Sequence, residues 1–123
     1  MNIEKLYLGG YQMNIYDTAN RLASEIKNSE EYINYKMAKE TIKLKPELQE
    51  KIKEFEKARY DAQISAIQTG KDDEEKVKKM QELYINLIAI DEVKKYFDAE
   101  IKFNVVLADV NKIIGEAVKD VLE

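Results

Sequence analysis

An apolar stripe with alternating steps of four and three residues runs along the C-terminal third of the chain. Steps of three and four keep side chains on one face of an α-helix, so the pattern predicts a long helix that packs against another helix. The position between Tyr96 and Phe103 is taken by Glu100, a charged residue in an otherwise apolar series. We call this series the C-terminal stripe; it comprises Tyr96, Glu100, Phe103, Leu107, Val110, Ile114, Ala117 and Val121.

A second stripe with the same spacing lies between Pro46 and Gly70. Proline fits the first turn of a helix and glycine fits the left-handed residue after its end, so these two residues predict the helix boundaries. The small alanines near the end of the stripe would let a partner backbone approach closely. The members of this stripe are Leu48, Ile52, Phe55, Arg59, Ala62 and Ala66.

Arg59 and Glu100 are each the lone charge in their stripe. One interpretation is an ion pair between the two long helices, within or between chains, that fixes helix register or oligomeric state. The other is that both side chains lie separately in solvent. We expect the ion pair.

Three further helices follow from capping residues and apolar spacing. Asn14 is expected to cap a first helix that ends near Lys27, and Ser29 a second that stops before Pro46. The apolar face of the second helix carries Tyr32, Tyr35, Ala38 or Lys39, and Ile42.

The last two helices begin at acidic residues. Asp72 or Asp73 is expected to cap a fourth helix, and Asp91 starts the fifth, which contains the C-terminal stripe and exceeds ~40 Å at 1.5 Å per residue. A helix of this length needs an antiparallel partner in the chain and a second subunit.

These patterns predict an all-α fold of about five helices, a long antiparallel hairpin or coiled-coil-like bundle that forms oligomers. A single helical domain is expected over residues 14–123, preceded by an arm over residues 1–13 that contains Gly9 and Gly10. Two explanations of the arm stay open, a flexible segment or residues foreign to the native protein.

The composition removes most routes to catalysis. The 123 residues include no histidine and no cysteine, so the usual acid–base group, the thiolate nucleophile and the common zinc ligands are missing. Asp72–Glu75 lacks the spacing of a calcium loop and fits a helix start better. We predict no catalytic residue, no metal site and no cofactor, and therefore no enzyme.

The charge pattern and the apolar runs restrict the partners and the location. The net charge is -4 with both signs interspersed, whereas nucleic-acid binders more often carry a one-sided basic patch. Apolar runs such as Val105–Ala108 are too short to span a membrane, and the first residues do not form a signal peptide. We expect a cytoplasmic protein.

Asn104 and Asn111 flank the C-terminal stripe seven residues apart. Asparagines at such positions can specify pairing between helices by hydrogen bonding, or they can form a plain exposed edge. Both interpretations stay open.

Several segments in order resemble the YlbF/YmcA family of small bacterial helical proteins, in its cysteine-free, YheA-like branch. The resemblance covers roughly Asn14 to Val118. The segments that carry it are Ser29–Tyr32, Pro46–Glu47, Glu54–Phe55, Gln68–Gly70, Ala99–Glu100 and Leu107–Ile114.

The resemblance implies long antiparallel helices, oligomerisation and a regulatory role. Studied members of the family assemble with one another and with a third protein, and they influence competence, biofilm formation, sporulation and messenger-RNA processing through ribonuclease Y. The iron–sulfur cluster of that regulatory complex needs cysteine ligands, which this chain does not have.

We therefore expect a non-enzymatic regulatory adaptor that forms a homodimer or higher homo-oligomer. Its expected protein partner belongs to the same family or to a ribonuclease-associated complex. The alternative is an RNA-associated factor that uses Lys36, Lys39, Lys43 and Lys45. The residues expected in the helix interface are Arg59, Ala62, Ala66, Tyr96, Glu100, Phe103, Leu107, Val110, Ile114, Ala117 and Val121.

Overall fold

The computed structural model describes residues 11–123, and this part of the chain folds into helices joined by short connections. The all-α prediction is confirmed. The expected N-terminal arm lies, up to residue 10, outside the described residues. Residues 11–123 form five helices: α2 (Tyr11–Lys27), α3 (Glu30–Lys43), α4 (Pro46–Thr69), α5 (Glu74–Ile88) and α6 (Asp91–Leu122).

Capping side chains begin two of the helices. The Ser29 hydroxyl accepts a hydrogen bond from the Tyr32 amide at 3.2 Å, which confirms the predicted cap of α3. Of the two candidates for α5, Asp73 is the cap, since its carboxylate accepts from the Glu75 and Lys76 amides. The predicted cap at Asn14 is wrong, because α2 already begins at Tyr11 and Asn14 lies inside it.

The predicted boundaries of α4 are confirmed. Pro46 occupies the first turn, where its missing N–H costs no helical hydrogen bond. Gly70 ends the helix with a φ of +76°, in the left-handed region that side chains with a Cβ avoid. The chain then turns and returns along α4 as α5.

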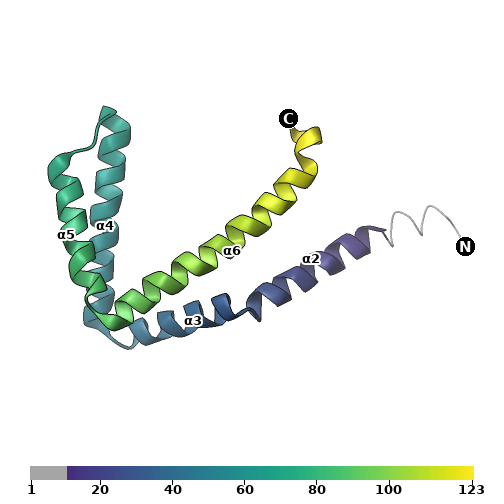
Figure 1. Cartoon of the computed structure of the whole chain (residues 1–123), viewed down its shortest axis with the longest axis horizontal. Helices are drawn as coiled ribbons and strands as arrows, with labels where there is room; N and C mark the ends of the chain where they lie inside the picture. The colour runs from purple at the N-terminus through teal and green to yellow at the C-terminus, as the bar shows by residue number, and fades with distance from the viewer. Residues whose placement is uncertain (1–10) are drawn as a thin grey trace, which may run out of the picture.

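The helices form a V, as Figure 1 shows. One arm is the hairpin of α4 and α5, and the other contains α3 and α6, with α2 continuing outward beyond α3. The α3–α6 pair is antiparallel, because Lys45 near the end of α3 contacts Glu92 near the start of α6, whereas Tyr32 contacts Phe103. At 32 residues, α6 is ~48 Å long, as its apolar pattern predicted.

The apolar core lies where the two arms meet. Val93 at the start of α6 is fully buried, and partly buried side chains from α5 and α6 pack around the core. The core joins the arms through contacts that bring α3, α4, α5 and α6 together. Its buried members are Ile42, Leu48, Ile52, Phe55, Leu87, Val93 and Phe97.

Candidate functional site: a helix-packing surface

Aromatic side chains hold α3 against the first half of α6. The Phe103 ring lies 5.7 Å from the ring of Tyr32 in an edge arrangement and 5.7 Å from the ring of Tyr35. Tyr35 also stacks on Tyr96 with centroids 5.8 Å apart. Offset and edge geometries of this kind stabilise a contact beyond the area that it buries. These contacts place the four aromatic side chains in the packing between α3 and α6.

A hydrogen bond crosses the same contact. The Tyr35 hydroxyl donates to Glu100 Oε2 at 3.2 Å, and the Tyr96 ring stacks beside Tyr35. Burial raises the pKa of Tyr96, with further increases from the neighbouring Tyr35 side chain and the negative charge of Glu100. Burial also raises the pKa of Tyr35, although the neighbouring Tyr96 side chain opposes the increase. Glu100 thus acts as an acceptor for a tyrosine on α3.

The predicted ion pair between Arg59 and Glu100 does not form within the chain. Arg59 pairs instead with Glu56, one turn earlier on α4, and its guanidinium lies 5.7 Å from the centroid of the Phe55 ring. The Arg59 side chain is 44% exposed. An ion pair within one helix turn and a contact with the neighbouring ring satisfy the guanidinium without Glu100.

The small residues of the α4 stripe, Ala62 and Ala66, pack within the chain. Ala62 is buried and Ala66 is half-buried on the hairpin arm, where α4 packs against α5. Their small size allows the two helices to approach closely. The structure therefore places Ala62 and Ala66 in packing within the chain.

The C-terminal stripe changes its environment after Phe103. Tyr96, Glu100 and Phe103 are half-buried against α3, but Leu107 is 36% exposed and Ile114 is 52% exposed. Val121, near the end of α6, is 81% exposed. We call the outer part the free stripe; it comprises Leu107, Val110, Ile114, Ala117 and Val121.

The free stripe runs past the start of α3. Figure 1 shows the last turns of α6 and the first turns of α2 moving apart, so the two helices enclose an open angle. On α2, Ile15 is 59% exposed, whereas Leu22 and Ile26 are half-buried nearer α3. Both helices therefore present apolar side chains that the described chain leaves largely in solvent.

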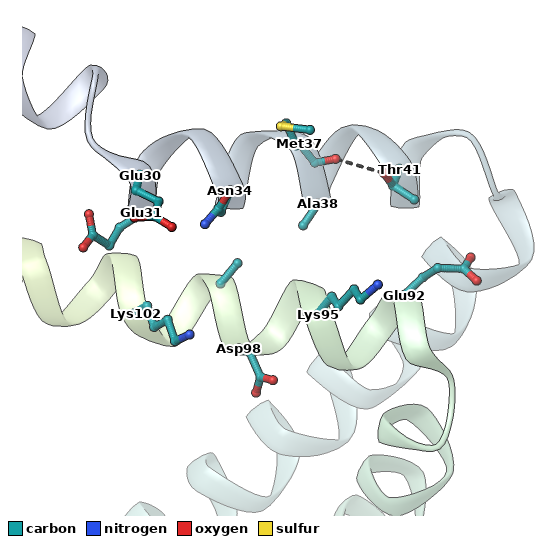
Figure 2. A pocket seen from close by; sticks show the side chains of 11 residues that line it. Glu30, Glu31, Asn34, Met37, Ala38, Thr41, Glu92, Lys95, Asp98 and Lys102 are labelled. Carbon is teal, nitrogen blue, oxygen red and sulfur yellow. Dashed lines mark hydrogen bonds between the residues drawn. The ribbon is translucent and has the colours of Figure 1, made fainter.

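A polar groove of about 650 Å³ lies between α3 and α6. Figure 2 shows Asn34 and Met37 of α3 on one side of it and Lys95 and Lys102 of α6 on the other. Lys95 is paired with Asp91 at 3.1 Å. The sequence analysis missed this groove, because its polar residues look like any solvated helix face, and it gathers no set of acids and bases arranged for catalysis.

The lysines considered for RNA binding do not form a uniform basic face. Lys39 lies over the Tyr35 ring, 5.4 Å from its centroid, and Lys45 is paired with Glu92. Lys36 and Lys43 are exposed. Acidic partners close to the lysines weaken the attraction for phosphate.

The acidic cluster after Gly70 begins a helix, as predicted. Asp73 caps α5, and Glu74 and Glu75 lie in its first turn, where the helix dipole favours negative charge. No group of acidic residues arranged to hold a metal ion occurs within residues 11–123. In the same part of the chain, every helix is too short or too polar to cross a bilayer.

Comparisons with known proteins find relatives over most of the chain. Residues 15–119 match the family model described as "Control of competence regulator ComK, YlbF/YmcA". A UPF0342 protein of Symbiobacterium thermophilum is 36% identical over 104 residues, which cover 85% of this chain and 93% of that protein. A UPF0342 protein of Desulfitobacterium hafniense is 34% identical over 110 residues, 89% of each chain.

A solved structure shares the fold. A chain from the crystal structure of Bacillus subtilis RicA in complex with RicF matches with a TM-score of 0.59 and 25% sequence identity. The match covers 90% of this chain and 98% of that chain.

Proposed function

The chain belongs to the YlbF/YmcA family, and we propose that it is a non-enzymatic regulatory adaptor that acts through helix-mediated protein–protein interactions. The description of the family names control of the competence regulator ComK. The adaptor serves regulation of this kind by presenting long helices to another protein, one of the same family or of a ribonuclease-associated complex.

The free stripe is the observation that carries this proposal. A helix face with Leu107, Ile114 and Val121 in solvent loses the stabilisation of apolar burial until another surface covers it. The solved chain that shares the fold comes from a complex of two proteins, RicA and RicF, which supports the same kind of assembly here.

A role without catalysis agrees with the chemistry of the groove. Its carboxylates and lysines come from solvated helix faces, and Glu92 and Lys95 are engaged with Lys45 and Asp91. With histidine and cysteine absent from the sequence, the groove has no group with an ordinary pKa near neutrality. The groove is therefore better suited to contact than to proton transfer.

Affinity capture with three matched baits tests the proposal. The baits are the unchanged chain, Ile114→Glu in the free stripe and Lys112→Glu on the opposite face of the same helix. We expect the first and third baits to retain the same partner protein, identified by mass spectrometry, and Ile114→Glu to lose at least ten-fold of it, since a charge in an apolar interface is strongly unfavourable. Equal capture by all three baits would contradict an adaptor that works through this face.

A further inference from the structure

The polar groove between α3 and α6 follows both helices for several turns. Its α3 side extends from Glu30 to Thr41, which is ~17 Å at 1.5 Å per residue. Ala38 of α3 and Ala99 of α6, both half-buried, line the groove, and Figure 2 shows Ala38 pointing toward α6. Side chains this small let a third helix approach the pair closely. The groove therefore has the length and the lining that suit a short docked helix.

A row of apolar side chains on α3 borders the groove. Ile33, Met37 and Leu44 follow one another in steps of four and seven, which keeps them on one face. Met37 belongs to both the row and the lining of the groove. It is 61% exposed, and Leu44 is 82% exposed. A helix lying in the groove would cover part of this row and be stabilised by its burial, and the flexible methionine adapts to partners of different shape.

The charged residues that line the groove are not balanced. Glu92 and Lys95 are already paired with other residues of the chain. The others form no ion pair within residues 11–123, and carboxylates outnumber ammonium groups among them: Glu30, Glu31, Asp98 and Lys102. The groove therefore carries an excess of negative charge that basic groups on a partner would neutralise.

We propose that this groove binds a helical segment of another protein that carries aliphatic residues in steps of three and four, flanked by lysines or arginines. The aliphatic side chains contact Met37, Ala38 and Ala99, and the flanking cations meet Glu31 and Asp98. This is the mode in which an amphipathic helix places its apolar face in a groove. The same carboxylates repel phosphate, so the charge favours a basic protein segment over nucleic acid.

The groove is separate from the free stripe. It lies along the first part of α6, from Glu92 to Lys102, whereas the free stripe begins at Leu107. A chain with both surfaces can bind two proteins at once. The inference thus goes beyond the proposed function, which uses the free stripe alone, and either surface can fail while the other still binds.

Selection of peptides tests the groove without assuming who the partner is. Two displayed libraries of helical peptides share a randomised apolar face and differ only in their flanks, which are lysine and arginine in one and glutamate and aspartate in the other. The full-length chain selects from both, and fluorescence anisotropy measures the affinity of the selected peptides. We expect binders from the basic library that bind Ala99→Leu and Asp98→Lys about ten-fold more weakly or worse, because the first fills the groove and the second reverses a charge.

Matched changes outside the groove are the controls. Ala23→Leu on the exposed surface of α2 and Asp61→Lys on the exposed surface of α4 should leave the affinity of these peptides unchanged. Ile114→Glu in the free stripe should also leave it unchanged, which separates this test from that of the proposed function. Circular dichroism establishes that each variant is folded.

Three results would overturn the proposal. The first is a basic library without binders that depend on Ala99 and Asp98, including one whose binders depend only on Ile114. The second is equal recovery of such binders from the acidic library, which rejects a basic partner. The third is a change of oligomeric state in Ala99→Leu by light scattering, which would show that a second copy of the chain occupies the groove.

Discussion

Two tyrosines and a glutamate supply the polar part of the contact between α3 and α6. The rings of Tyr35 and Tyr96 provide apolar area, and the Tyr35 hydroxyl donates a hydrogen bond to the carboxylate of Glu100. Rings pack in many registers, whereas a hydroxyl donating to one carboxylate defines a single register. Glu100 therefore has a structural role in the stripe that its neighbours in the sequence do not reveal.

Removal of one hydroxyl tests that role. Tyr35→Phe keeps the ring and deletes the donor to Glu100, so we expect the free energy of unfolding to fall by about 1 kcal/mol. The measurement is urea denaturation followed by circular dichroism. Tyr16→Phe, on the exposed surface of α2, is the matched control and should change the stability little. Equal effects of the two substitutions would show that the bond to Glu100 contributes nothing to stability.

The raised pKa of Tyr96 predicts how stability depends on alkaline pH. Below pH ~10 the residue is neutral in both folded and unfolded chains, so it adds no pH dependence there. Above that pH the unfolded chain releases the proton while the folded chain holds it, because burial raises the pKa in the folded state. The free energy of unfolding should therefore fall with rising pH.

Tyr96→Phe isolates this contribution from that of the lysines, which titrate in the same range. Denaturation of both proteins between pH 9 and about 11.5 should show a shallower decline for the variant. Parallel declines would mean that Tyr96 ionises equally easily in both states.

At the scale of the elements, local residues define several of the helix ends. Ser29 and Asp73 satisfy amide groups at helix starts, and Gly70 turns the chain at the tip of the α4–α5 hairpin. These features act over a few residues only. They help to define where α3 and α5 begin and where α4 ends.

Replacement of glycine by alanine should change the stability in opposite directions at Gly70 and at Gly115. Gly70→Ala forces a Cβ into the left-handed region and should destabilise by about 1 kcal/mol, with backbone strain as the only cost, since nothing lies within 4 Å of the added atom. Gly115→Ala, also with open space around it, lies inside α6 and should stabilise by roughly 0.5–1 kcal/mol. Thermal unfolding measures both; shifts of the same sign would contradict the argument.

At the scale of the whole molecule, the sequence predicts the helices better than their arrangement. Pro46, Gly70 and the acidic caps act locally, so the predicted ends agree with the structure to within a few residues, except at Asn14. The apolar spacing predicts that α6 has an antiparallel partner in the chain, but it does not identify α3 as that partner. The spacing does not show where along α6 the apolar stripe stops being covered by another helix. Phe103 and Leu107 occupy equivalent positions in the pattern, but only Phe103 packs against α3.

The same limit explains why the predicted ion pair between Arg59 and Glu100 does not form within the chain. A charge in an apolar stripe identifies a side chain that needs a polar partner, but not which partner it finds. Arg59 reaches Glu56 on its own helix, and Glu100 meets a tyrosine on α3. The groove between α3 and α6 was missed for a related reason, since its concavity depends on how two solvated faces approach each other.

The position of the core at the meeting point of the two arms has a mechanical consequence. The arms act as levers about that point: α4 has 24 residues, and at its length of ~36 Å a rotation of about 10° at the core displaces the tip of the hairpin by ~6 Å. A small change in packing around Phe97 or Val93 that rotated the arm would therefore displace the far end of the arm by more than it displaced the core side chains. In this geometry, the displacement caused by a rotation at the core grows with distance along the arm.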